Sequence, residues 1–218
     1  MYRALLFDLD GTLAETDSLH LPTWVDTLEP YGVEVDEEFY RDRISGRNTN
    51  EIVRELLPDL PDARGRSIGE AKEASFRERA SDLEPLPGLI HFVERGRELG
   101  MHIALVTNAP EANVEAILLA LKLRDFFDVV VLADEVEAVK PDPAPYRAAL
   151  SKIGVPAEEA LAFEDSVSGI SSSVAAGIPT VGIASSQDPE KLLGAGAFTT
   201  ANDFTDPQLR DLLRRRSV

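Results

Sequence analysis

The stretch LLFDLDGTLAETDSLH, from Leu5 to His20, contains the pattern that decides the fold. It begins as an apolar run typical of a buried strand and then places two carboxylates, Asp8 and Asp10, where that strand should end. A buried carboxylate is costly unless a cation or hydrogen-bond donors accompany it. We therefore expect the strand to lead into a site that binds a cation, carries out a reaction, or does both.

Further apolar runs follow at intervals, and helical patterns separate the later ones. The segment 89–99 ends before Gly100, and the segment 143–154 opens with proline and closes with glycine, which are typical helix boundaries. Strands that alternate with helices predict an α/β fold with a doubly wound parallel sheet. The expected strands are 4–10, 102–107, 127–133, 161–165 and 178–183.

One long segment, residues 16–84, lacks a strand pattern and instead shows several amphipathic helical stretches. The sequence PLPG, from Pro85 to Gly88, then returns the chain to the α/β pattern. We predict a core domain of residues 1–15 and 85–218 and a helical cap of residues 16–84. Ligands of open α/β sheets bind outside the carboxyl ends of the strands, and the insertion leaves the core at that edge.

Composition narrows the classes of partner. The 218 residues carry a formal net charge of -17, which disfavours binding to nucleic acid or to an anionic membrane. The chain has no cysteine, so disulfides and thiolate metal sites are excluded. We found no signal peptide and no apolar run of membrane-spanning length. These features predict a cytoplasmic monomer whose partner is a small molecule.

Polar side chains follow each core strand at its carboxyl end. Because a parallel sheet brings these ends to one edge, we expect the side chains to meet there. Four acids, one lysine and a hydroxyl suit Mg²⁺ and a phosphoryl group, since Mg²⁺ prefers carboxylates, waters and phosphate oxygens. The residues are Asp8 and Asp10, Thr107 and Asn108, Lys140, and Glu164 with Asp165.

We expect the two acids of the first strand to have different chemical roles. Asp8 is the candidate nucleophile, because carboxylates form aspartyl-phosphate intermediates. Asp10 is the candidate general acid and base. Gly11 permits a tight turn next to them, and we expect the Thr12 hydroxyl to hold that turn with a hydrogen bond.

The other strand ends are predicted to bind metal and phosphate. Metal ligation falls to Asp8, Asp165 and Glu164, and the bound cation offsets the repulsion between a carboxylate and a phosphate dianion. We expect Lys140 to contact the phosphate through its charge. We expect hydroxyl, amide and backbone groups to donate hydrogen bonds to it. The predicted phosphate-binding residues are Gly11, Thr107, Asn108 and Lys140.

Four motifs follow one another along the chain: DLDGT at 8–12, VTN at 106–108, KPDP at 140–143 and FEDSVSG at 163–169. Their order resembles that in the haloacid dehalogenase (HAD) superfamily. The sequence resembles the phosphatase and phosphomutase branch of that superfamily over essentially its whole length. The resemblance implies a Mg²⁺-dependent aspartyl-phosphate mechanism with the roles given above. It also implies that the backbone carbonyl of Asp10 binds the metal.

Cap residues are the candidates for contacting the rest of the substrate. His20 falls where sugar-phosphate mutases and several phosphatases of this branch carry histidine. Arg47 and Lys72 are long cations on the predicted cap helices, where exposed, solvated charges are the simpler interpretation. We expect Trp24 to lie in the core of the cap.

Three functions remain open on these residues. The first is a phosphatase for a small phosphorylated metabolite such as a sugar phosphate, and the second is a β-phosphoglucomutase-like isomerase. Those mutases carry a cap arginine that aligns with Thr49, whereas the nearest arginine here is Arg47, which favours hydrolysis. His20 and Trp24, by contrast, fit the mutase pattern. The third is a phospho-accepting signalling domain, which Asp10 and the inserted cap disfavour. A dehalogenase is disfavoured because the second acid and the metal ligands are present.

Overall fold

A computed structural model describes residues 2–213 and contains one parallel sheet within them. The strand order is β3-β2-β1-β4-β5-β6, so β1 lies inside the sheet between β2 and β4, where the order reverses. The predicted doubly wound α/β fold is confirmed. It has a sixth strand that was not predicted, because its sequence, TTA, is not an apolar run. The strands are β1 (Ala4–Phe7), β2 (His102–Val106), β3 (Val129–Val131), β4 (Ala160–Glu164), β5 (Thr180–Ile183) and β6 (Thr199–Ala201).

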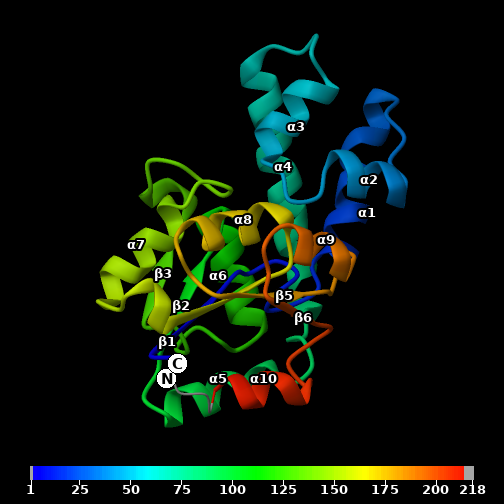
Figure 1. Cartoon of the computed structure of the whole chain (residues 1–218). Coiled ribbons are helices and arrows are strands. Elements are labelled where there is room, and N and C mark those ends of the chain that lie inside the picture. Colours follow the sequence, from blue (N-terminus) through cyan, green and yellow to red (C-terminus); the bar gives the residue numbers. More distant parts are fainter. Residues whose placement is uncertain (1, 214–218) are drawn as a thin grey trace. The chain divides into compact units, whose positions relative to one another are not determined.

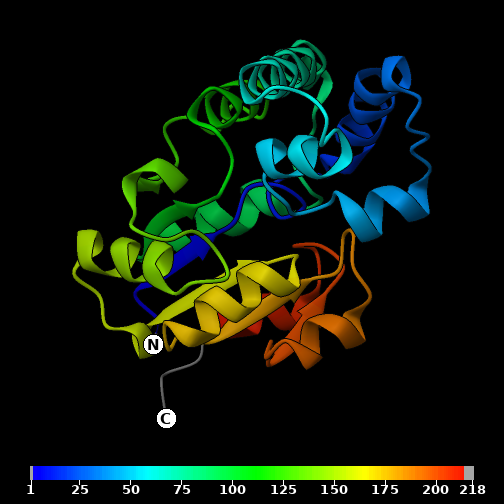
Figure 2. The same cartoon turned by 90° about the horizontal axis from the view of Figure 1, so that it is seen from above.

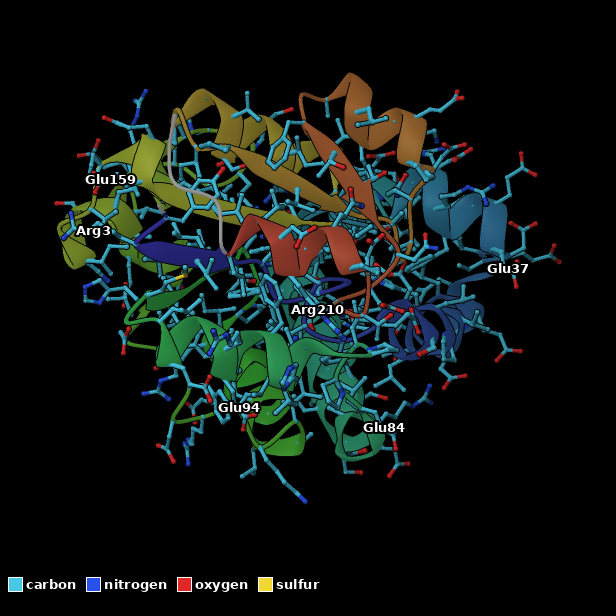
Figure 3. The ribbon with its side chains drawn as sticks, turned by 60° about the horizontal axis from the view of Figure 1, so that its bottom comes forward. Arg3, Glu37, Glu84, Glu94, Glu159 and Arg210 are labelled. Atoms are coloured by element: carbon cyan, nitrogen blue, oxygen red, sulfur yellow. The ribbon has the colours of Figure 1, made fainter. Side chains whose placement is uncertain are left out.

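Alternate residues of the central strands pack against different helices, as the period of a strand requires. On one face, helix α5 (Leu89–Glu98) approaches so closely that a Cβ added to Gly96 would lie 2.7 Å from Cδ1 of Leu5. Phe7 and Phe163 stack on the same face with ring centroids 4.9 Å apart. Helix α10 (Pro207–Leu212) lies beside α5, as Figure 3 shows with Glu94 on one helix and Arg210 on the other.

The opposite face of the sheet is covered by helix α7 (Ala144–Ile153) and helix α8 (Val167–Ala175), which are neighbours in space (Figures 1 and 2). Tyr146 of α7 is fully buried here with Ala4 and Leu6 of β1. The remaining core elements are α6 (Glu111–Ala120), α9 (Pro189–Gly194), η3 (Ala133–Glu135) and η4 (Ala157–Glu159).

The chain forms two compact units. One contains the residues up to Glu15 and those from Leu83 onward, and the other contains Thr16–Asp82. The sequence placed the second boundary before Pro85, but Leu83 is already buried and the short helix η2 (Ala80–Asp82) ends just before it.

The smaller unit is entirely helical over α1 (Asp17–Leu28), η1 (Glu29–Tyr31), α2 (Glu37–Arg43), α3 (Thr49–Leu56) and α4 (Asp62–Arg79). Asp36 and Asn48 cap the amino ends of α2 and α3 by accepting bonds from backbone N–H groups. Trp24 lies in its core with 2% exposure. Across residues 2–213 no helix combines the length and the apolar character that a membrane crossing needs.

Candidate active site

Asp8 and Asp10 lie in a tight turn that directly follows β1. The amides of Gly11 and Leu13 donate to the carbonyls of Ala14 and Leu9, at 2.8 Å in each case. Gly11 has φ of +72°, and a Cβ there would lie 2.1 Å from Oδ2 of Asp165. Glycine is therefore required both by the backbone conformation and by the acid packed against it.

Thr12 does not hold this turn as the sequence suggested. Its hydroxyl is buried and has no hydrogen-bond partner among the described residues, so the hydrogen bonds within the turn come from the backbone. The expectation was wrong because the backbone satisfies the turn locally and leaves the side chain facing the core.

Lys140 is buried at the centre of the site. Its Nζ lies 2.5 Å from Oδ1 of Asp8, 2.6 Å from Oε1 of Glu164 and 2.7 Å from the carbonyl oxygen of Val106. These three acceptors match the three donors of an ammonium group. The two carboxylates raise the pKa of Lys140 above its usual value, although burial alone would lower that pKa.

Three acids, Asp8, Glu164 and Asp165, each offer an oxygen within 4.8 Å of the others. When all are ionised, they outnumber the buried ammonium of Lys140. Burial, together with the charges of Glu164 and Asp10, raises the pKa of Asp8 to about 8 despite the opposing effect of Lys140. Either a proton or a cation must therefore balance the cluster, and the hard oxygen donors fit a divalent cation such as Mg²⁺.

Glu164 is fully buried and closely constrained. Its Oε1 accepts from Lys140 and, at 2.7 Å, from the hydroxyl of Tyr146. A Cβ at Gly169 would lie 1.9 Å from Oε2, so only glycine leaves room for this acid. Burial and the charge of Glu164 raise the pKa of Tyr146, which keeps that hydroxyl protonated.

Asp165 is fixed from two sides. The hydroxyl of Ser186 donates to its Oδ2 at 2.8 Å, and Gly11 packs against the same carboxylate. Ser166 caps helix α8 by accepting from the amide of Gly169 at 3.0 Å. The cap of this helix is therefore Ser166, and neither Glu164 nor Asp165 is needed for that task.

Thr107 and Asn108 follow β2, and Asn108 contacts the backbone of Lys140. Oγ1 of Thr107 accepts from the amide of Ala109 at 3.0 Å. The side-chain amide of Asn108 bonds both the backbone N–H and the carbonyl of Lys140, at 3.2 and 3.3 Å. The structure therefore brings Asn108 to the backbone of Lys140, a positioning contact that the sequence did not predict.

In the cap, His20 and Lys72 lie together. Nζ of Lys72 is 3.0 Å from Nδ1 of His20 and 3.1 Å from the carboxylate of Glu73. The ammonium also lies 5.0 Å from the ring centroid of Trp24, and the ring of His20 stacks on Phe76. Lys72 is only 2% exposed, so it is not the solvated helix charge that its sequence context favoured.

Arg47 has different partners from the other two cap candidates. Its guanidinium donates to Glu55 at 2.7 Å and to the carbonyl of Arg43 at 2.8 Å. Arg43 pairs with the same carboxylate. The structure thus brings His20 and Lys72 to each other and engages Arg47 in an exposed ion pair.

Comparisons with known proteins identify the family of the chain. The family of haloacid dehalogenase-like hydrolases matches residues 5–183. The chain belongs to this family. Protein CbbY of Rhodobacter capsulatus is 34% identical over 93% of this chain and 89% of its own length. The phosphorylated carbohydrates phosphatase of Thermotoga maritima is 33% identical over 89% of this chain and 91% of its own.

A solved structure of a CbbY variant from Rhodobacter sphaeroides, in complex with xylulose-(1,5)bisphosphate, has a TM-score of 0.80 to this chain. The two are 30% identical, and the match covers 94% of this chain and 96% of the other. The family assignment from the four motifs, and the expectation of an enzyme from the phosphatase branch, are confirmed. Tyr146 and Ser186 were missed, because neither lies in a motif.

Proposed function

We propose that this protein is a Mg²⁺-dependent phosphatase that hydrolyses a small phosphorylated carbohydrate through a phosphorylated Asp8. The observation that carries the proposal is the buried contact of 2.5 Å between Asp8 and Lys140, with Glu164 and Asp165 adjoining it. The relatives support it, since one is named a phosphatase of phosphorylated carbohydrates.

In the first step, an oxygen of Asp8 attacks phosphorus and the bond from phosphorus to the sugar oxygen breaks. Asp10 donates a proton to the departing alkoxide, a task typically worth about 10²–10⁴-fold in rate. Lys140 and the hydroxyl of Thr107 stabilise the charge that develops on the phosphoryl oxygens.

In the second step, Asp10 takes a proton from water and the water oxygen attacks phosphorus. The bond between phosphorus and Asp8 breaks, which releases inorganic phosphate and restores the carboxylate. One pair of acids thus serves both half-reactions, and the covalent intermediate divides one difficult displacement into two easier ones.

Mg²⁺ would be held by Asp8 and Asp165, with Glu164 and the Asp10 carbonyl as further candidate ligands. When bound, it offsets the repulsion between the nucleophilic carboxylate and the phosphate dianion. The donor set fits this ion, because the carboxylates lie close together and carry at least one negative charge that the ammonium of Lys140 does not balance.

We propose that the cap selects the substrate, with His20 and Lys72 contacting the part remote from the phosphoryl group. Arg47 is the weaker candidate, since Glu55 already engages it. We further propose that the segments 14–17 and 83–87 act as hinges that let the cap close and exclude water.

A phosphomutase remains the second candidate, because the His20–Lys72 pair offers a cation in the cap. A mutase needs a cationic anchor for the second phosphate of a bisphosphate intermediate. Here Lys72 lies beside Glu73, and the hydroxyl of Thr49 also donates to that carboxylate. A carboxylate at this place repels a second phosphate, so hydrolysis of a monophosphate is the better fit.

The test is phosphate release from a panel of sugar monophosphates, phosphoglycolate and nucleotides, with Mg²⁺ and with EDTA. We expect Mg²⁺-dependent release at about 1 s⁻¹ or faster on the best substrate. Isomerisation of β-glucose 1-phosphate, primed by a bisphosphate, should be much slower. The opposite ranking would establish the mutase.

A further inference from the structure

The two adjacent acids of the site, Glu164 and Asp165, each receive a hydroxyl from outside the four motifs. Tyr146 of α7 donates to Glu164, and Ser186, in the loop after β5, donates to Asp165. We infer that these hydroxyls are positioning residues that assign the acids different tasks: Tyr146 holds Glu164 on Lys140, and Ser186 holds Asp165 ready for the cation.

The first task follows from the surroundings of Tyr146. Its ring is fully buried in an apolar cluster with Ala4, Leu6 and Val106, where phenylalanine would fill nearly the same volume. A buried hydroxyl is costly unless it makes a hydrogen bond. The hydroxyl makes that bond to Glu164, so its presence is explained by the acid rather than by packing.

The bond from Tyr146 begins a continuous chain of contacts to the proposed nucleophile. Tyr146 donates to Oε1 of Glu164 at 2.7 Å, the same Oε1 accepts from Lys140 at 2.6 Å, and Lys140 donates to Asp8 at 2.5 Å. Gly169 packs so closely against the same carboxylate that an added Cβ would lie 1.9 Å from Oε2 and 2.0 Å from Oε1. Glu164 is therefore fixed in an orientation that aims Lys140, and loss of the tyrosine hydroxyl removes one of its constraints.

The second task follows from the loop after β5. Ser186 donates to Oδ2 of Asp165, and the neighbouring Ser185 donates to the carbonyl of Gly11 at 2.5 Å. Gly11 in turn packs against Asp165. One loop thus holds both the acid and the turn beside it. Hydrogen bonds of this kind orient metal-binding carboxylates, and their loss typically costs about 10–100-fold in metal affinity or activity.

The two roles predict opposite effects in two binding measurements. Tyr146→Phe should weaken binding of inorganic phosphate, measured with saturating Mg²⁺, by about 10-fold, and should leave the Kd for Mg²⁺ within about 3-fold. Ser186→Ala should weaken Mg²⁺ binding to the metal-stripped protein by about 10-fold or more. At saturating Mg²⁺, the phosphate affinity of Ser186→Ala should return to within about 3-fold of the phosphate affinity of the unaltered protein.

Isothermal titration calorimetry with Mg²⁺ alone, and then with inorganic phosphate, makes both measurements. Ser173→Ala is the matched control, because that buried hydroxyl bonds Thr180 in another part of the core. It should change neither affinity. Ser186→Thr keeps the hydroxyl and should restore Mg²⁺ binding. Should Tyr146→Phe fail to fold, Tyr146→Met removes the same hydroxyl and should also weaken phosphate binding while leaving the Kd for Mg²⁺ within about 3-fold.

The inference is overturned if both variants weaken Mg²⁺ binding equally, or if neither differs from Ser173→Ala. The inference rests on the proposed function only in treating inorganic phosphate as the product of the reaction. If the protein hydrolyses no phosphate ester, the proposed function fails, and the split between the two affinities still decides the tasks of Tyr146 and Ser186.

Discussion

Nζ of Lys140 lies 2.5 Å from Oδ1 of Asp8, although the two residues are 132 positions apart in the chain. Both side chains are almost completely buried, and Glu164 is the second carboxylate on the same ammonium. The pair places a cation directly beside the proposed nucleophile, and we expect both the stability and the chemistry of the site to depend on it.

Lys140→Ala should abolish most activity and destabilise the protein. It leaves Asp8 and Glu164 buried without their common cation, and breaking a buried pair in this way typically costs about 3–5 kcal/mol. Urea unfolding in EDTA measures the free energy of unfolding. Lys152→Ala is the control, because its pair with Glu135 is exposed and should contribute about 1 kcal/mol or less. Equal losses in the two variants would contradict the account.

Removal of the metal should stop turnover. EDTA should abolish phosphate release, and added Mg²⁺ should restore it, whereas Ca²⁺ should inhibit because its larger, more flexible coordination shell disturbs the in-line geometry. Asp165→Ala should raise the Mg²⁺ concentration needed for half-maximal activity more than Glu164→Ala does. Full activity after exhaustive metal removal would exclude the proposed role of the acidic cluster.

The pKa of Asp8 predicts a dependence on pH in the metal-free protein. Because burial raises this pKa to about 8, the folded state retains a proton that the unfolded state releases at lower pH. The contribution of Asp8 to stability is therefore fully present below its usual pKa of about 3.8 and is lost as pH rises toward 8. Thermal unfolding from pH 5 to pH 9 should show this decline in EDTA.

Asp8→Asn is the matched control for that decline, since asparagine does not titrate. Its unfolding temperature should fall less over the same range of pH than that of the unaltered protein. Mg²⁺ binds the ionised acid, so its affinity should rise with pH. Identical pH profiles for Asp8→Asn and the unaltered protein would refute the assignment.

Gly169→Ala should disrupt the site by contact with Glu164. The added Cβ would lie 1.9 Å from Oε2, and the fully buried acid has no open space into which to move. We expect a large loss of activity with weakened phosphate binding. Gly194→Ala is the control, since nothing lies within 4 Å of its added Cβ and the residue ends helix α9. Its activity should be unchanged.

The sequence predicted the sheet and the meeting of its strand ends, because buried strands are apolar runs and the motif acids follow them directly. It could not predict the contacts of Tyr146 and Ser186. In the sequence Tyr146 resembles any core aromatic residue of a helix, and Ser186 any loop serine. Their acids lie 18 and 21 positions away, so only the folded backbone brings the groups together.

The sequence could not predict the burial of Lys72, for a similar reason. Half of the residues of α4 are charged, which is typical of a solvated helix, but the His20 and Trp24 that contact Lys72 come from α1. The apolar stem and ammonium are enclosed by rings from another helix, and only the packing of the cap determines that. The strand β6 was not predicted because its sequence, TTA, is not an apolar run, unlike that of the equally short strand β3.

The most direct test of the central claim is whether Asp8 carries the phosphoryl group during turnover. The protein is mixed with its best substrate and Mg²⁺, quenched in acid within milliseconds, digested, and the peptides are analysed by mass spectrometry. We predict one added phosphoryl group on the peptide that contains Asp8, which disappears as the substrate is exhausted and is absent in Asp8→Asn. An Asp8→Asn variant that still releases phosphate at the normal rate, with no phosphorylated peptide in either protein, would contradict the account.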